Sequence, residues 1–173
     1  WANTANQNRF LRNVVMHEHG HGLGLLHVCT QNTVILMEPF IDTSYDGPRQ
    51  DDIRGAQFNY GDPFENNNTA ATATPLGALA SGGTINSSPV PAPVTGSSDA
   101  NSSIYSIDFS GKQDWFSFTV SSAIQGTITV TPVGSTYDNS TQGSSGCPAT
   151  INNINTLAVA DLAIEVYASN GTT

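Results

Sequence analysis

VVMHEHGHGLGLLHV, residues 14–28, holds all four histidines of the 173-residue chain. His17 and His21 are four residues apart, so a helix places both imidazole rings on one face, close enough to share a metal ion. Glu18 lies about 100° round that helix from His17, where it can flank a metal ion without ligating it. His19 points about 200° away from His17 and is predicted not to be a ligand. The stretch therefore predicts a helical metal site with a carboxylate beside it.

A third imidazole can reach the same ion only if the helix ends before His27. Gly24 can adopt the positive φ that such a sharp turn requires. His17, His21 and His27 would then supply three nitrogen ligands and leave the fourth position of a tetrahedral zinc ion open to water, as in a catalytic rather than a structural site. Because zinc lowers the pKa of bound water towards ~7, Glu18 is predicted to act as the general base. The simpler interpretation is a histidine cluster without metal. The positions of Glu18, His21, Gly24 and His27 relative to His17 all match those that a zinc site requires, and they favour zinc.

The segment HEHGHGLGLLH, residues 17–27, is similar to the zinc helix H-E-x-x-H-x-x-G-x-x-H of the metzincin proteases. LMEP, residues 36–39, resembles their methionine turn, with Met37 beneath the ligands. DDIRGAQFNYG, residues 51–61, resembles the last helix of the matrixin branch. The resemblance covers residues 9–61 and implies a zinc endopeptidase in which Glu18 polarises the attacking water. The chain departs from the matrixin pattern after His27 and in a slightly longer spacer before Met37.

The resemblance also implies a substrate pocket opposite the zinc ion. Its wall would be Glu38–Asp46, made partly apolar by Phe40 and Ile41. Tyr45 is a candidate for stabilising the oxyanion, as a tyrosine does in some metzincins, although it does not directly follow the methionine.

Composition limits the partners and the compartment. The chain has 5 Lys and Arg against 14 Asp and Glu, a formal charge of -9, which argues against nucleic acid or an anionic membrane surface as partner. No apolar run approaches the ~18 residues of a membrane span. Protein or peptide substrates and a secreted, extracellular protein are expected, whereas the sequence does not predict the oligomeric state. Because the chain starts at Trp1 without an initiator methionine, we expect a fragment. The export signal and the substrate-aligning half of the catalytic domain would lie upstream, so the fragment alone need not be active.

The two cysteines leave alternatives open. Cys29 and Cys147 are far apart and do not make a disulfide framework. Cys29 lies two residues after His27 and could be a metal ligand. A structural cysteine, or one whose partner lies outside the chain, is favoured because three histidines already fill the protein's share of a catalytic zinc site.

Three regions are predicted: 1–61, the lower part of a catalytic domain; 62–75, a polar linker; and 76–173, an antiparallel β-sandwich that is cut short. Helices are expected at 8–23 and 49–61, the first capped by asparagines. In the first helix, the i, i+4 spacing of Phe10 and Val14 and of Leu11 and Val15 stacks apolar rows on one side. Alternating apolar residues predict strands at 114–120, 126–132 and 161–167, and a long surface loop at 136–156. The fold class is α+β.

The second region resembles the bacterial pre-peptidase C-terminal domain, a β-sandwich appended to secreted proteases. The resemblance is carried by NNNTAATATPLG (66–77), DWFSFTV (114–120) and DLAIEVYASNG (161–171), and it implies an accessory role. Its aspartates are more often turn caps than calcium ligands, although a Ca²⁺ site is an open alternative; the candidates are Asp99, Asp108, Asp114 and Asp161. Trp115 is predicted to be a core aromatic rather than a binding platform.

Two functions from different classes compete. One is a zinc endopeptidase, and the other is a non-catalytic, zinc-stabilised extracellular binding or adhesion module. Glu18 discriminates between them because a structural site needs no base and usually fills its fourth coordination position. A zinc deaminase is disfavoured because the chain lacks a Cys-x-x-Cys pair.

Overall fold

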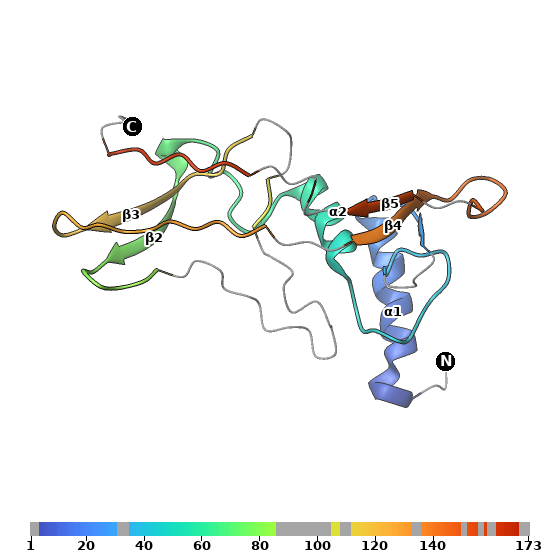
Figure 1. Cartoon of the computed structure of the whole chain (residues 1–173). Coiled ribbons are helices and arrows are strands. Elements are labelled where there is room, and N and C mark those ends of the chain that lie inside the picture. Colours follow the sequence, from blue (N-terminus) through green and yellow to red (C-terminus); the bar gives the residue numbers. More distant parts are fainter. Residues whose placement is uncertain are drawn as a thin grey trace.

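The computed structural model combines helices with two small sheets. It describes residues 4–30, 35–85, 105–107, 112–132, 136–149, 152–155, 158 and 162–169. In chain order the elements are α1 (Ala5–Gly22), β1 (Val28–Cys29), α2 (Gln50–Tyr60), the 3-10 helix η1 (Ala70–Thr72), β2 (Thr74–Leu79), β3 (Phe116–Val120), β4 (Thr136–Thr141) and β5 (Asn152–Asn155). Both helices gather with β4 and β5 at one end of the molecule, whereas β2 and β3 lie at the other (Figure 1). The coarse expectation of an α+β protein is therefore confirmed.

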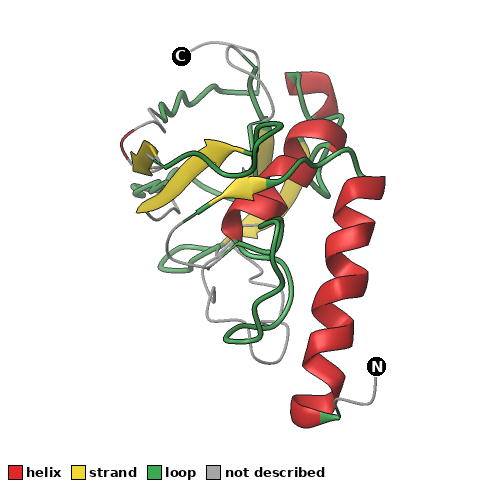
Figure 2. Cartoon of the chain, turned by 90° about the vertical axis from the view of Figure 1, so that its right-hand side faces the viewer, coloured by secondary structure: helices red, strands yellow, loops and turns green. Residues whose placement is uncertain are grey.

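The first predicted helix is confirmed as α1, but its start and its inward face differ from the prediction. Residues 6–8 have positive φ angles of 51°, 59° and 62°, so the regular helix follows them and does not begin at an asparagine cap. The buried residues of α1 are Asn13, His17 and Gly20, whereas Val15 is 57% exposed. A polar stripe with a glycine therefore faces the interior, in place of the expected apolar rows. The N-terminal end of α1 projects beyond the rest of the molecule (Figure 2).

The second predicted helix is confirmed as α2. Gly61 follows its last residue with a φ of 79°, the left-handed conformation that favours glycine after a helix. Asp51 and Asp52 lie in the first turn, where the positive end of the helix dipole favours carboxylates. Asp52 is buried and points back towards the segment after β1, which makes α2 part of the support of the metal centre.

The sheets differ from the predicted sandwich. β1, β4 and β5 form an antiparallel three-stranded sheet in the order β1-β4-β5, and β2 pairs with β3 in parallel. Residues 136–156 were expected to be a surface loop, yet they contain β4 and β5. The described residues of 126–132 and 161–167 are not strands, so only the prediction at 114–120 is confirmed, as β3. No sandwich is present in the described part of the chain.

A disulfide joins the N-terminal region to the β4–β5 hairpin. Cys29 in β1 is bonded to Cys147, 118 residues further along the chain. The favoured interpretation of Cys29 is therefore wrong in one respect, because its partner lies inside the chain. The disulfide also removes the alternative of a metal-ligating Cys29, since both sulfur atoms are used.

The best-buried apolar cluster lies beside the histidines. Ile35 and Met37 are each 2% exposed and form its centre. Leu25, Val28 and Ile154 pack against them, so α1's following turn, β1 and β5 all contribute to this core. Among the described helices, none is long and apolar enough to span a bilayer.

The expected linker makes specific contacts with the region after it. Asp62 accepts a hydrogen bond from the Ser106 backbone N–H at 2.7 Å. The ring of Phe64 stacks on Tyr105 with centroids 4.9 Å apart, and Tyr105 meets Phe116 of β3 edge-on at 5.3 Å. Trp115, predicted to be a core aromatic, is half-buried and lies 5.1 Å from the Tyr167 ring.

Candidate metal centre

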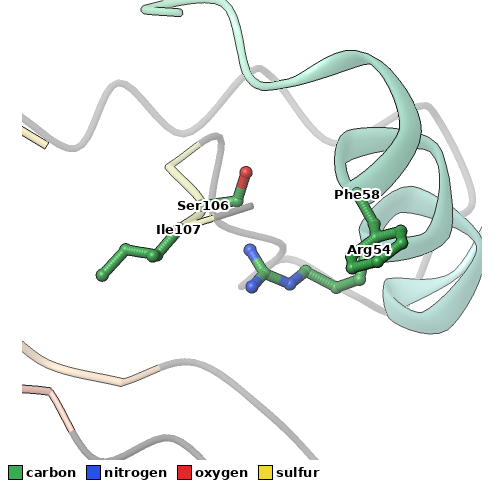
Figure 3. Close-up of a pocket in the computed structure, with 4 residues that line it drawn as sticks. All are labelled: Arg54, Phe58, Ser106 and Ile107. Atoms are coloured by element: carbon green, nitrogen blue, oxygen red, sulfur yellow. The ribbon is translucent and has the colours of Figure 1, made fainter. Parts of the chain in front are cut away.

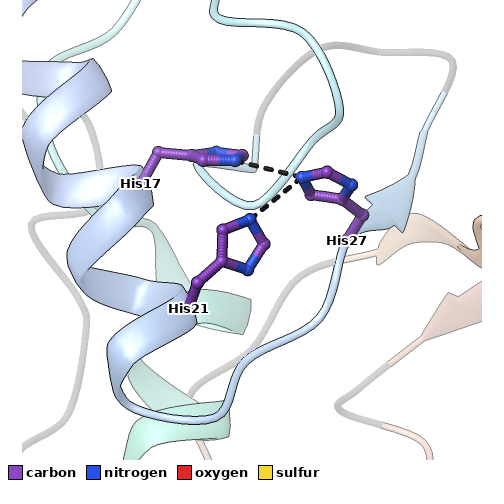
Figure 4. A group of neighbouring side chains, drawn as sticks. All are labelled: His17, His21 and His27. Atoms are coloured by element: carbon purple, nitrogen blue, oxygen red, sulfur yellow. Dashed lines mark hydrogen bonds between the residues drawn. The ribbon is translucent and has the colours of Figure 1, made fainter.

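Helix α1 and the turn after it bring three imidazoles together. His17 and His21 project from the same face of α1, one turn apart (Figure 4). The helix closes with Leu25 N–H donating to the Gly20 carbonyl at 3.0 Å, and Gly24 takes a φ of +82°. The chain then doubles back and delivers His27 to the same place, as the spacing predicted. The ligand atoms of His17, His21 and His27 all lie within 4.8 Å of one another, so these side chains could hold a metal ion. Among the described residues, no other cluster of three or more His, Cys, Asp or Glu side chains meets this condition.

The separations of the His27 nitrogen from those of His17 and His21 suit a tetrahedral zinc ion. The Nε2 atom of His27 lies 3.1 Å from the Nε2 atoms of both His17 and His21. Zinc–nitrogen bonds of 2.0–2.1 Å in a tetrahedron separate two ligand nitrogens by about 3.3 Å. Little movement of the rings is needed to accommodate an ion at their centre.

The other ring nitrogens define which nitrogen faces the ion. His17 Nδ1 lies 2.7 Å from the Leu36 carbonyl, His21 Nδ1 lies 2.9 Å from the Leu25 carbonyl, and His27 Nδ1 lies 2.6 Å from Gln142 Oε1. Each partner is an oxygen that can only accept, so each Nδ1 carries the proton and each Nε2 keeps its lone pair. Three lone pairs directed at one point repel one another unless a cation lies between them. The donor set therefore fits zinc, whose common ligand is neutral imidazole.

Met37 lies directly against α1 at Gly20. It is 2% exposed, and a Cβ atom built on Gly20 would come 2.4 Å from the Met37 sulfur. The Met37 carbonyl accepts the Val28 N–H at 2.9 Å, next to His27. Gly20 was missed by the sequence reasoning, although its position three residues after His17 on the same face could have indicated a close approach.

Asp52 of α2 holds the methionine turn in place. Its carboxylate accepts the backbone N–H groups of Leu36 at 2.9 Å, Met37 at 3.0 Å and Arg49 at 2.7 Å. Burial raises the pKa of Asp52 to about 6, although these backbone hydrogen bonds act in the opposite direction. The carbonyl of the same Leu36 accepts the Nδ1 proton of His17. Asp52 of α2 therefore supports the candidate ligand His17 indirectly, through the backbone of Leu36.

The predicted pocket wall is fixed to α1 by a buried amide. Asn13 Nδ2 donates to the carbonyls of Asp42 at 2.8 Å and Tyr45 at 3.0 Å, and its Oδ1 accepts the Gly47 N–H at 3.0 Å. Arg12 pairs with the Asp46 carboxylate in the same segment. The sequence analysis did not predict this role of Asn13, because an asparagine within a helix does not by itself indicate which backbone groups its side chain contacts.

The three candidate pocket residues face different surroundings. Phe40 is 79% exposed and Ile41 is half-buried, so both can line an open surface. Tyr45 is 5% exposed, and its hydroxyl donates to the Ile35 carbonyl at 2.7 Å. Burial raises the pKa of Tyr45 well above its ordinary value. This placement makes Tyr45 a structural residue and gives no support to the oxyanion role.

Glu18 and His19 are both exposed on α1. Glu18 follows His17 directly, and its carboxylate is open to solvent, as a base that acts on water requires. His19 lies outside the group of converging imidazoles, as its helical angle predicted. Of the calcium candidates, Asp99, Asp108 and Asp161 lie outside the described residues, so that site stays a prediction.

A cavity of about 160 Å³ lies beside α2, and no histidine lines it (Figure 3). It is lined by Arg54 and Phe58 of α2 and by Ser106 and Ile107. Arg54 already donates to the Tyr105 carbonyl at 3.2 Å. None of the four lining residues is a base that could activate the Ser106 hydroxyl, so the histidine cluster is the better candidate for chemistry.

One comparison with known proteins bears on the first region. A family model described as Matrixin matches residues 1–61, the segment that contains α1, the methionine turn and α2. This match supports a matrixin-like metalloprotease region, which implies zinc, peptide substrates and metalloendopeptidase activity at the level of the family. No curated protein and no solved structure matches the chain significantly.

Proposed function

We propose that this chain carries the zinc-binding and catalytic part of a secreted endopeptidase. The observation that carries the proposal is the convergence of His17, His21 and His27, because the Nε2 atom of His27 lies 3.1 Å from the Nε2 atoms of the other two rings. When bound by these imidazoles, zinc would lower the pKa of a water molecule and polarise the carbonyl of the scissile bond.

The residues of the chain have separate roles in this proposal. His17, His21 and His27 hold the ion, and the carbonyls that accept their Nδ1 protons keep each ring in the binding tautomer. Glu18 removes the proton from the attacking water and later delivers it to the leaving amine. Phe40 and Ile41 contact the side chain that follows the scissile bond, because they are the accessible apolar residues of the predicted wall.

Two further properties support work outside the cytoplasm. The Cys29–Cys147 disulfide is typical of proteins that leave the reducing cytosol. A formal charge of -9 keeps such a protein soluble and away from anionic surfaces. We propose an accessory role for the region after residue 75, in agreement with its resemblance to pre-peptidase C-terminal domains.

Zinc binding and peptide hydrolysis are tested separately. The purified chain should contain one zinc ion, and His17→Ala should lose it, because a site with two imidazoles holds zinc poorly. Casein cleavage is then measured for the chain and for the longest natural form that contains it. Glu18→Ala should retain zinc and lose at least about 100-fold in rate, the usual contribution of a general base.

His19→Ala is the matched control, since His19 is the exposed neighbour of Glu18 and lies outside the cluster. It should retain both zinc and activity. Equal cleavage by Glu18→Ala and the wild type would reject the catalytic assignment. Full zinc occupancy without cleavage by the longest form would favour the zinc-stabilised binding module.

A further inference from the structure

The third ligand is held differently from the other two. The Nδ1 atoms of His17 and His21 donate to nearby backbone carbonyls, whereas that of His27 donates to the side chain of Gln142, 115 residues further along the chain. We propose that Gln142 is a positioning residue for His27, and that the β4–β5 hairpin is part of the metal centre. This inference rests on the proposed function, because it concerns the same zinc site.

His27 depends on outside support because it does not lie in a helix. α1 ends at Gly22, and β1 begins at Val28, so His27 is the last residue of an irregular segment. The ring is only half-buried, and packing alone does not fix its orientation. The hydrogen bond of the His27 Nδ1 atom therefore selects the tautomer that is protonated at Nδ1, and it selects the ring orientation that directs Nε2 towards the other two histidines.

Three links place Gln142 beside His27. Val28 pairs with Thr141 and Cys29 pairs with Ser140, so the strand that follows His27 runs alongside the strand that precedes Gln142. The Cys29–Cys147 disulfide ties the far end of the same turn to β1.

Between these links, the turn is closed upon itself. Gly143 and Gly146 exchange two backbone hydrogen bonds of 3.0 Å each, and Gly146 has a φ of +102°, which favours glycine. Gln142 therefore lies at the start of a short closed turn. Pairing of β4 with β1 fixes the residues before this turn, and the disulfide to Cys29 fixes its end.

The chemistry of Gln142 suits this position. Its amide oxygen accepts the Nδ1 proton at 2.6 Å and leaves Nε2 free to bind the ion. Partners of this kind typically change metal affinity by 10- to 100-fold when removed. Because Gln142 is exposed, water can partly replace it, and we expect the lower end of that range, about tenfold.

The test compares two substitutions of similar size in the full chain. Gln142→Met removes the acceptor, and Gln142→Glu keeps one. Zinc affinity is measured by competition with a chromophoric chelator, and the tautomer of each imidazole is read from long-range ¹H–¹⁵N correlations of the zinc-loaded protein. Gln125→Met is the control, because Gln125 is an exposed glutamine away from the cluster.

We expect Gln142→Met to weaken zinc binding about tenfold and to change the His27 nitrogen shifts alone. Gln142→Glu should restore both readouts, which a purely structural loss of hairpin packing would not produce. Wild-type affinity and unchanged His27 shifts in Gln142→Met would overturn the inference.

A second comparison examines the disulfide. Replacing both cysteines, by Cys29→Ser with Cys147→Ser, should also weaken zinc binding, because the turn that carries Gln142 loses its attachment and no free thiol is left beside His27 to bind zinc. Adding Gln142→Met to that variant should have a smaller effect than in the disulfide-bonded protein, since both changes act on one contact. If the serine variant does not fold, the Gln142 pair in the oxidised chain still decides the question.

The two proposals fail in different ways. If Glu18→Ala cleaves casein normally while Gln142→Met loses zinc, the catalytic assignment is wrong and the positioning role stands. If Glu18 proves essential while Gln142→Met binds zinc normally, only the positioning role is wrong.

Discussion

Substituting Gly20 by alanine examines the contact between Met37 and the zinc helix. A Cβ atom at this position would lie 2.4 Å from the Met37 sulfur and 3.2 Å from its terminal methyl carbon. Met37 is 2% exposed within the Ile35 cluster, so its side chain has little space into which it can move. Overpacking of this kind costs about 1–3 kcal/mol. Alanine in a helix interior gains up to about 1 kcal/mol over glycine, so a net loss of roughly 1 kcal/mol is expected.

Gly22→Ala supplies the comparison, because no atom lies within 4 Å of a Cβ built there. As the last residue of α1 it gains less in helix propensity than an interior position, but it lacks the overpacking, so it should be neutral or stabilising. The free energies of unfolding, measured by urea titration of both zinc-free variants, should therefore differ by about 1–3 kcal/mol.

Met37→Ala provides an internal check on this contact. It removes the obstructing sulfur, so Gly20→Ala should cost less in that background than in the wild type. The reasoning is refuted if Gly20→Ala stabilises the protein as much as Gly22→Ala, since Met37 would then not lie against α1.

Three further outcomes are expected. The pKa of Asp52 is raised from 3.8 to about 6, so the folded chain binds the carboxyl proton more tightly than the unfolded chain. The stability that this binding contributes is present below about pH 4 and is lost as the pH rises through 6. Relative to Asp52→Asn, the wild type should lose up to about 3 kcal/mol over that interval in zinc-free urea titrations, and the shared histidines cancel in the difference. Chelation of zinc held at 100 times its dissociation constant should remove about 3 kcal/mol of stability and lower the melting temperature, whereas His17→Ala should melt equally with and without chelator. Asn13→Ala should destabilise the chain by about 2–4 kcal/mol, because the carbonyls of Asp42 and Tyr45 and the Gly47 N–H lose their partner, and calorimetric melting checks this loss.

The sequence was most informative where the geometry is local. Helical spacing predicted that His17 and His21 share a face, and the conformational freedom of Gly24 predicted the return of His27. The structure contains both features because they depend on fewer than a dozen neighbouring residues. α2 was predictable for the same reason, since its acidic first turn and its final glycine are short-range signals.

The remaining parts depend on contacts that spacing does not encode. Residues 136–141 are polar and lack alternation, yet they pair with β1, because tertiary context outweighs strand propensity. Ile128 and Ile164 show the opposite case, since their segments alternate well but form no strand in the described structure, and both side chains are half exposed. Gln142 could not be recognised as a neighbour of His27 without that long-range pairing.

The bond between Cys29 and Cys147 also changes what happens to a chain that is cut. The two cysteines lie 118 positions apart in the sequence, and the predicted pocket wall and α2 lie between them. A single break in the backbone anywhere in that interval leaves both pieces in one covalent molecule. A chain cut there would keep its two pieces joined, and the damage would become visible on a gel only after treatment with a thiol.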